Sequence, residues 1–230
     1  MNAAAQTILE ADDVYHIYHR SEVKTVALRG AHVALGHGSW TTLMGPSGSG
    51  KSTLLHILAG LLEPSAGTVV AGGVDVTRLP PSARAGWRRR NVGLVLQRDN
   101  LHPHLNLADN VALTLRLQGL ALAEIRNRVA ELLHLVGLRH RSLHFMGQLS
   151  GGEAQRAAIA VALAPRPGVL LADEPTGELD EATAGGILDL LDGLVADQGL
   201  AILTATHNKQ VEARAGHHLA IRDGQVIHAR

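Results

Sequence analysis

The sequence predicts an α/β fold in which a mostly parallel β-sheet is flanked by helices. Short, uninterrupted apolar runs occupy residues 92–96, 168–172 and 201–206, and such runs are typical of strands buried on both faces. Segments with helical periodicity separate these runs, and this alternation predicts strand–helix–strand units. We expect two additions to the sheet: a small antiparallel β subdomain at the N-terminus and a helical insertion subdomain.

The first ninety residues alternate strand-like runs with turns. The runs 7–9, 14–18 and 25–28 predict strands of the antiparallel sheet. Further strands are expected at 40–43 and 68–70, a helix from Thr53 onwards, and a turn at Gly72 and Gly73. Pro80 and Pro81 are typical of the first turn of a helix. Four arginines in this region predict a solvated face or a partner contact: Arg84, Arg88, Arg89 and Arg90.

A helical region separates two of the buried strands. Its clearest apolar repeat, at i, i+4, i+7, i+8 and i+11, consists of Ile125, Val129, Leu132, Leu133 and Val136. The helical pattern begins at 107, and we expect a subdomain at approximately 100–164 within a single domain that spans 1–230. A capping box of Ser150 and Glu153 predicts a helix through residue 164. A helix at 180–198 and a strand pair at 217–228 complete the chain.

The segment Gly45–Thr53 reads Gly-Pro-Ser-Gly-Ser-Gly-Lys-Ser-Thr and matches the phosphate-binding pattern G-x-x-x-x-G-K-[ST]. A predicted strand precedes it and a predicted helix follows, which is the context that the motif needs. Glycines let the backbone N–H groups turn towards phosphate oxygens, and a helix N-terminus adds partial positive charge. Lys51 can reach the β- and γ-phosphates, and Ser52 offers a hydroxyl to Mg²⁺. A Gly/Ser-rich turn without function is the less favoured alternative.

Polar residues follow the buried strands. Gln97, the pair Asp173-Glu174 and His207 each stand at a strand end, where ligands bind in open α/β sheets. Alternatively, the carboxylates mark a solvated strand end and the histidine is structural. Tyr15 and Tyr18 can each stack on a base or be half-buried strand residues.

Composition excludes several classes of protein. The 21 basic and 21 acidic residues give a net charge of +0, so no bulk basic field favours nucleic acid. The chain has no cysteine, and hence no disulfide or Cys-based zinc site. No apolar run approaches the roughly 20 residues of a membrane span, and the N-terminus lacks the pattern of a secretion signal, so we expect a soluble chain. Among the 14 histidines, the pairs His102/His104 and His217/His218 suggest a metal site without an evident third ligand.

The joint order of these motifs resembles the ATP-binding cassette (ABC) ATPases, from about residue 7 to the end. The run Gln148-Leu-Ser-Gly-Gly-Glu is similar to the signature motif that separates this family from other phosphate-loop ATPases. The run 173–180 resembles the branch that serves lipoprotein release, macrolide export and cell-division permeases. The resemblance implies a phosphate-loop NTPase core of the RecA-like type.

The resemblance also implies roles for individual residues. Tyr18 would stack on adenine and the loop would bind the phosphates: Gly45, Pro46, Ser47, Gly48, Ser49, Gly50, Lys51, Ser52 and Thr53. Mg²⁺ would be held by Ser52, Gln97 and Asp173. Glu174 would be the general base or water-orienting carboxylate, with catalytic roles also for His207, Gln97 and Lys51. The γ-phosphate of ATP on a second copy would be bound by Ser150, Gly151 and Gly152, and Asp180 is placed with the nucleotide-binding residues.

By the same resemblance, the chain would bind and hydrolyse ATP to power a separate membrane permease, leaning towards export or extraction. Expected partners are the permease, docked by a helix in the groove beside residues 97–106, and a second copy or a sister ATPase; no nucleic acid is expected. The location would be cytoplasmic, peripheral on the inner face of the plasma membrane. Alternatives are a soluble ABC ATPase acting on ribosomes or DNA and a regulator that scarcely hydrolyses. Four positions depart from the family pattern: Ala154, Val161, Glu178 and Asn208.

Overall fold

The computed structural model describes residues 7–20 and 23–228. In chain order its first elements are β1 (Thr7–Arg20), β2 (Val23–Gly36), β3 (Trp40–Met44), α1 (Lys51–Leu58), β4 (Ala66–Ala71), β5 (Val74–Asp75), α2 (Pro81–Asn91) and β6 (Val92–Val95). The remaining elements are α3 (Leu107–Leu117), α4 (Leu122–Leu135), α5 (Gly151–Leu163), β7 (Val169–Asp173), α6 (Glu181–Gln198), β8 (Ala201–Thr206), α7 (Lys209–Arg214), β9 (His217–Arg222) and β10 (Gln225–His228).

The central sheet has the strand order β10-β9-β3-β8-β7-β6 and is parallel except for the antiparallel pair β9–β10. In its register Met44 lies opposite Thr206, and Asp173 opposite Ala205. The carboxyl ends of β3, β7 and β8 therefore meet at one edge of the sheet. The residues that follow these strands are brought together there, as the sequence predicted.

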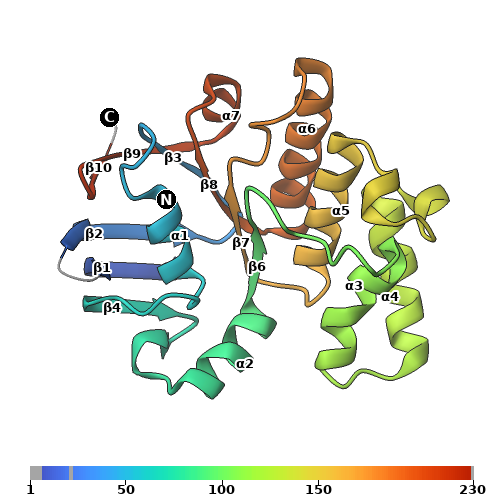
Figure 1. Cartoon of the computed structure of the whole chain (residues 1–230), viewed down its shortest axis with the longest axis horizontal. Coiled ribbons are helices and arrows are strands. Elements are labelled where there is room, and N and C mark those ends of the chain that lie inside the picture. The colour runs from blue at the N-terminus through green and yellow to red at the C-terminus, as the bar shows by residue number, and fades with distance from the viewer. Residues whose placement is uncertain (1–6, 21–22, 229–230) are drawn as a thin grey trace, which may run out of the picture.

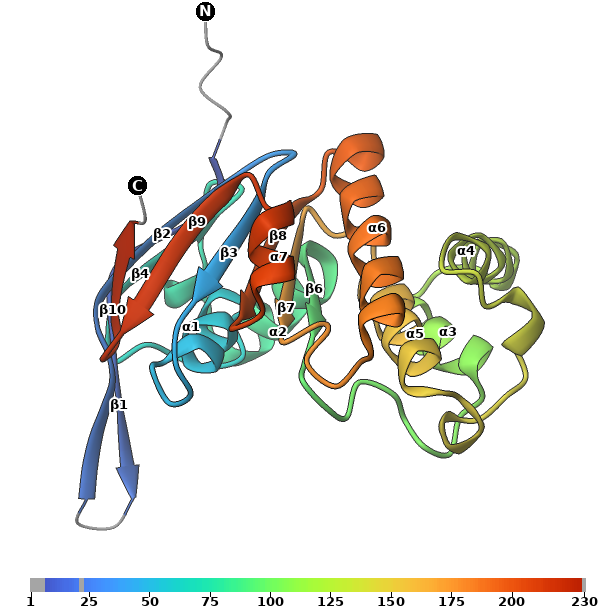
Figure 2. The same cartoon turned by 90° about the horizontal axis from the view of Figure 1, so that it is seen from above.

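The N-terminal sheet has the order β2-β1-β4-β5 and is antiparallel, as expected (Figure 1). The expectation of separate strands at 7–9 and 14–18 is wrong, because both belong to the single strand β1. The polar residues between them, Asp12 and Asp13, form an irregularity of the strand rather than a loop, with register shifts around them and φ 50° at Asp13. Figure 2 shows the β1–β2 hairpin extending beyond the rest of the sheet.

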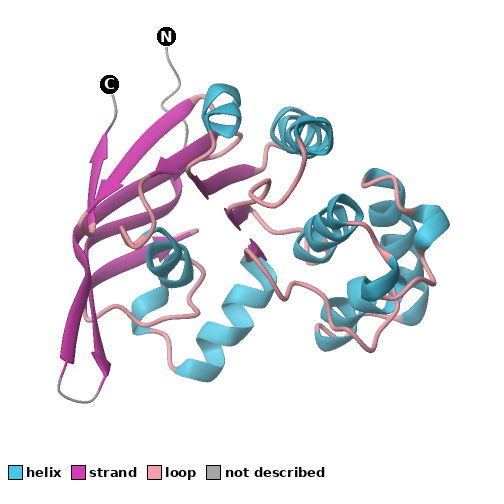
Figure 3. Ribbon diagram, turned by 45° about the horizontal axis from the view of Figure 1, so that its top comes forward, coloured by secondary structure: helices cyan, strands magenta, loops and turns pink. Residues whose placement is uncertain are grey.

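Side chains of the central strands alternate between two apolar clusters. In β7 and β8, Leu170 and Ile202 join one cluster, which includes residues of α3, α4, α5 and α6. Leu171 and Leu203 join the other, which includes residues of α1 and the N-terminal sheet. Since successive side chains of a strand point to opposite faces, strands covered on both faces read as continuous apolar runs. Figure 3 shows one group of helices on the side of the molecule away from the N-terminal sheet, and further helices lying beside the strands.

The helical region follows the predicted periodicity. All five residues of the apolar repeat that predicted α4 are buried, and α5 begins after Ser150, whose hydroxyl accepts from Glu153 N at 3.2 Å. None of the helices within residues 7–20 and 23–228 combines the length and apolarity needed to span a bilayer.

Two further features differ from the expectations. The short helix α7 was not predicted, because it has six residues and only Val211 is buried. The arginine-rich segment is only partly a solvated face: Arg84 pairs with Glu63 at 2.8 Å, and Arg88 donates to Gly60 O at 3.0 Å.

His16 is a buried titratable group in β1. It is 7% exposed, its Nδ1 has no hydrogen-bond partner, and its ring packs edge-on against Tyr18 with centroids 4.5 Å apart. Burial lowers the pKa of His16, with smaller opposing and assisting contributions from a backbone bond to Glu63 and from His19. The unfolded chain therefore binds this proton at higher pH than the folded chain does.

We expect this histidine to make stability depend on pH. The free energy of unfolding should rise as the pH increases from about 5 to 7, and His16→Gln should reduce that slope. Urea titrations at several pH values measure the slope. The exposed His19 supplies the control: if His19→Gln flattens the profile as much as His16→Gln does, burial of His16 is not the cause.

Candidate functional site

A pocket of about 680 Å³ lies at the carboxyl edge of the parallel strands. It brings together residues from β1 and β2, from the loop before α1, and from the ends of β6, β7 and β8. Its lining consists of Tyr18, Thr25, Val26, Ala27, Pro46, Ser47, Gly48, Gly50, Lys51, Ser52, Thr53, Gln97, Asp173, Glu174 and His207. Most residues predicted from the sequence to form the site therefore share one cavity.

The loop between β3 and α1 is shaped by close backbone contacts. A Cβ at Gly45 would lie 2.4 Å from Ile221 O, and one at Gly50 would lie 2.7 Å from Ala27 O. Gly50 also has φ 109°, a conformation that only glycine adopts readily. Gly45 and the buried Ser49 form the inner side of the loop, where Ser49 O accepts from Gly224 N at 3.1 Å.

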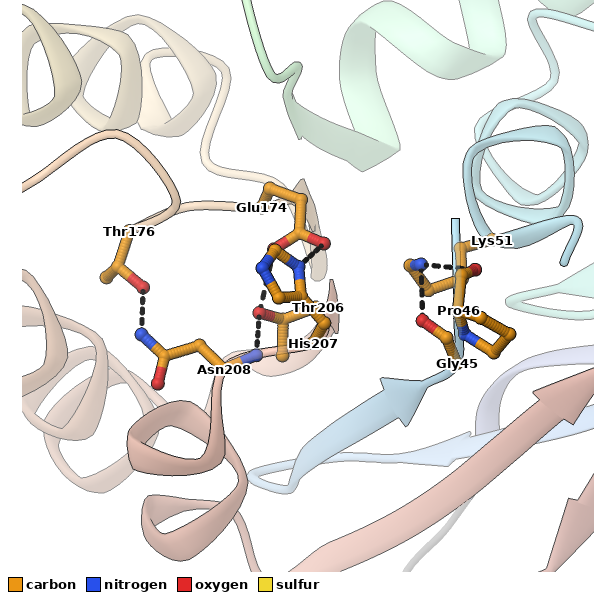
Figure 4. Close-up of polar contacts among 8 residues, drawn as sticks. All are labelled: Gly45, Pro46, Lys51, Glu174, Thr176, Thr206, His207 and Asn208. Carbon is orange, nitrogen blue, oxygen red and sulfur yellow. Dashed lines mark hydrogen bonds and ion pairs between the residues drawn. The ribbon is translucent and has the colours of Figure 1, made fainter. Parts of the chain in front are cut away.

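The N-terminus of α1 faces the pocket, since Lys51, Ser52 and Thr53 all line it. The helix begins after Gly50, which supplies no side-chain cap to its first N–H groups. Lys51 is 8% exposed, and its Nζ donates to Gly45 O at 2.7 Å and to Pro46 O at 3.1 Å (Figure 4). A buried ammonium beside uncapped helical N–H groups suits an anion such as a phosphate.

Glu174 occupies the position immediately after β7. Its N–H continues the sheet pattern by donating to Ala205 O at 2.8 Å, although its φ of 48° is in the left-handed region. Its carboxylate accepts from Thr206 Oγ1 at 2.9 Å and from His207 Nδ1 at 2.8 Å (Figure 4). The two bonds hold both carboxylate oxygens in a fixed orientation.

Sequence reasoning did not identify Thr206 as part of this arrangement. Its hydroxyl accepts from Asn208 N at 3.0 Å and donates to Glu174. The only signal in the sequence is a hydroxyl at the last position of a buried strand, directly before His207.

Asp173 is the last residue of β7 and is 6% exposed. Burial raises its pKa, contact with the Ser52 hydroxyl lowers it, and the neighbouring Glu174 raises it. Ser52, Gln97 and Asp173 line the same pocket and offer hydroxyl, amide and carboxylate oxygens. This is the donor set that Mg²⁺ prefers, so the residues present fit that ion.

The histidine pairs do not form a metal centre in the part of the chain that the structure describes. No group of three or more His, Cys, Asp or Glu side chains is placed there to hold a metal. The rings of His102 and His104 pack edge-on with their centroids 5.8 Å apart, and His218 Nδ1 lies 3.1 Å from Thr42 Oγ1.

Of the two tyrosines, Tyr18 lines the pocket and Tyr15 does not. The Tyr18 hydroxyl lies 3.3 Å from Thr53 Oγ1, and the residue is 37% exposed. An exposed ring above the helix N-terminus provides a flat surface for stacking.

Six predicted site residues do not line this pocket. Gly45 and Ser49 belong to the inner side of the phosphate-binding loop, and the other four are Ser150, Gly151, Gly152 and Asp180. Gly151 and Glu178 line a second cavity of about 340 Å³, together with Gln97 and Glu174. A Cβ at Gly152 would lie 2.2 Å from Thr183 Cγ2, and Asp180 caps α6 by accepting from Thr183 N at 3.0 Å. The chain therefore does not bring the start of α5 into its own phosphate-loop pocket.

The four departures from the family pattern each have a structural setting. Ala154 and Val161 pack against the apolar cluster of the helical region. Asn208 caps α7 by accepting from Gln210 N at 2.8 Å. Glu178 forms an ion pair with Arg98 at 2.6 Å.

Comparisons with known proteins found a matching family and similar chains. The family model described as ABC transporter matches residues 28–177. The chain is similar to LolD of Hyphomonas neptunium, a lipoprotein-releasing system ATP-binding protein, with 40% identity over 223 residues, 96% of this chain and 97% of that protein.

Solved structures are similar over the same length. The ATP-binding cassette MJ0796, in a dimeric post-hydrolysis state bound to ADP and Pi, has a TM-score of 0.89 and 33% identity, covering 96% of this chain and 99% of that chain. A second dimeric structure of MJ0796 gives the same TM-score and coverage at 34% identity. For cbiO1 from Clostridium perfringens, part of the ABC transporter complex cbiONQ, the TM-score is 0.84 at 29% identity, covering 96% of this chain and 87% of that chain.

The tight contact at Gly45 predicts a loss of stability on substitution. Gly45→Ala should lower the free energy of unfolding by about 1–3 kcal/mol, because the new methyl group meets a backbone oxygen that cannot move freely. Gly216→Ala is the control, since a Cβ there meets nothing within 4 Å. Urea denaturation compares the two variants, and equal stabilities would contradict the prediction.

Proposed function

Because the chain belongs to the ABC transporter family, we propose that it is the ATP-hydrolysing subunit that powers a separate membrane permease. One observation carries the proposal: a single pocket joins the phosphate-binding loop to Asp173, Glu174 and His207. Phosphoryl transfer to water needs positioned donors and charge neutralisation more than covalent chemistry, and this pocket supplies both.

ATP binds along this pocket. Tyr18 stacks on the adenine, and the loop from Gly45 to Thr53 surrounds the phosphates with N–H groups. Lys51 exchanges its carbonyl contacts for the β- and γ-phosphate oxygens. These assignments are supported by the exposure of the Tyr18 ring and by the uncapped N-terminus of α1.

Ser52, Gln97 and Asp173 hold Mg²⁺ when the nucleotide is bound. The ion neutralises charge on the β- and γ-phosphates. Asp173 is suited to this role because its carboxylate is buried beside the Ser52 hydroxyl. Its raised pKa is expected to fall on binding a cation, because a positive charge favours the ionised carboxylate.

Glu174 orients the attacking water and accepts its proton. Thr206 and His207 hold its two carboxylate oxygens, so the group does not need to reorganise during the reaction. His207, 73% exposed at its side chain, is also free to reach the γ-phosphate with its remaining ring nitrogen.

Ser150, Gly151, Gly152 and Asp180 act on ATP held by a second copy. None of the four lines the chain's own pocket, which supports a head-to-tail pair in which each copy completes the other's site. The MJ0796 structures are dimeric, which favours a pair of identical chains over a pair with a sister ATPase.

The permease is the partner that the relatives indicate. LolD is named for a lipoprotein-releasing system, and cbiO1 is part of an ABC transporter complex. The proposed docking place is the groove beside residues 97–106, and it would locate the chain at the cytoplasmic face of the membrane. These relatives favour a transporter over the alternative of a soluble ATPase acting on ribosomes or DNA.

Glu174→Gln tests the composite site. We expect this variant to bind Mg-ATP without hydrolysing it, and therefore to form a stable dimer that the wild type forms only transiently. Solution mass with and without Mg-ATP, measured alongside phosphate release, checks the prediction. A variant that remains monomeric at saturating ATP would contradict the head-to-tail pair, and one that hydrolyses at the wild-type rate would contradict the role of Glu174.

Thr206→Val tests the orientation of the carboxylate. Loss of the hydroxyl should lower kcat by about ten- to 150-fold while leaving the KM for ATP unchanged, since one hydrogen bond to a charged group is removed. Thr204→Val is the matched control: Thr204 lies on the same strand, is equally buried and accepts only from Trp40 Nε1, at 3.1 Å. Equal effects of the two variants on kcat would indicate a general loss of packing.

A further inference from the structure

The loop after β6 and the loop after β7 are joined by an ion pair that the binding of nucleotide does not use. Arg98 donates from Nε and Nη2 to the same oxygen of Glu178, Oε1, at 3.0 and 2.6 Å. The side chains are 74% and 56% exposed. Pairs this exposed contribute little to stability, so the significance of this one lies in what it connects.

The ion pair ties together the two segments that carry the hydrolytic groups. Arg98 directly follows Gln97, and Glu178 lies in the loop that begins with Glu174. Gln97 and Glu174 line the nucleotide pocket, and all four residues line the adjoining cavity of about 340 Å³. A change in the ion pair therefore acts at the boundary between the two cavities.

Each of the two segments is closed by hydrogen bonds of its own. Asn100 accepts from Leu96 N at 2.7 Å and donates to Leu96 O at 2.6 Å, which fixes the turn that carries Gln97 and Arg98. In the second segment, the N–H of Gly177 donates to Glu174 O at 3.1 Å. The ion pair therefore connects two turns that are each closed by hydrogen bonds.

We propose that Arg98 and Glu178 are positioning residues whose ion pair keeps Gln97 aligned with Glu174. A partner that displaces the 97–106 loop would thereby shift the alignment of the metal-binding amide with the water-orienting carboxylate. Neither residue of the pair lines the pocket proposed for the nucleotide. This inference rests on the proposed function. It extends that function by linking the 97–106 loop directly to the hydrolytic carboxylate of Glu174.

Charge reversal tests the pair in the full chain. Arg98→Glu and Glu178→Arg should each lower kcat about two- to fivefold, the range expected for an exposed ion pair. Both should weaken the apparent affinity for Mg²⁺, which reports the position of Gln97, while the melting temperature stays unchanged. The double variant R98E/E178R restores the pair with reversed polarity and should recover the wild-type rate and Mg²⁺ affinity.

The control is Arg166→Glu, which breaks the ion pair between Arg166 and Glu131. The side chains of these residues are 72% and 53% exposed, and neither residue lines either cavity. It should leave kcat and Mg²⁺ affinity unchanged. Two results would overturn this inference: single variants with the wild-type rate, or a double variant whose rate does not recover. The proposed function would survive either result if the wild type hydrolyses ATP faster than Glu174→Gln in the same assay. A wild type no faster than Glu174→Gln would overturn the proposed function and this inference together.

Discussion

The parallel hydrogen bonding of β3, β8 and β7 is the constraint on which the site depends. Its register ends all three strands at one edge, where the phosphate-binding loop, Glu174 and His207 continue the chain. The bond from Glu174 N to Ala205 O extends this pattern one residue past β7. Because buried apolar side chains on both faces fix the strands, the polar groups at their ends inherit a rigid geometry.

Much of this arrangement could be predicted from the sequence, because burial of the strands determines both their apolar composition and the place where they end. Strands covered on both faces need continuous apolar runs, so their ends were visible, and with them Gln97, Asp173 and Glu174. The sequence did not predict that β1 is one continuous strand, because Asp12 and Asp13 interrupt its apolar pattern and a polar interruption is typical of a loop. The bond from Thr206 to Glu174 and the pair Arg98–Glu178 depend on contacts 32 and 80 residues apart, which leave no periodic pattern. The division into subdomains stays a prediction.

The position of α5 gives the start of that helix a different task from the phosphate-binding loop. Its capping box occupies the N–H of Glu153, whereas the N–H groups of Gly151 and Gly152 have no partner within the helix. At Gly152 a side chain would collide with Thr183, so the close packing of α5 on α6 requires glycine there. The same residues therefore serve the packing of one chain and, by our proposal, the ATP of another.

The backbone conformation of Glu174 lowers the stability of the fold at a residue that, by our proposal, is needed for activity. A side-chain-bearing residue in the left-handed region costs of order 1–2 kcal/mol relative to glycine, which adopts that conformation freely. Glycine at this position would relieve the strain but would also remove the carboxylate that Thr206 and His207 hold. The fold therefore carries a strained backbone at the residue on which, by our proposal, hydrolysis depends, and the two hydrogen bonds to its carboxylate offset part of that strain.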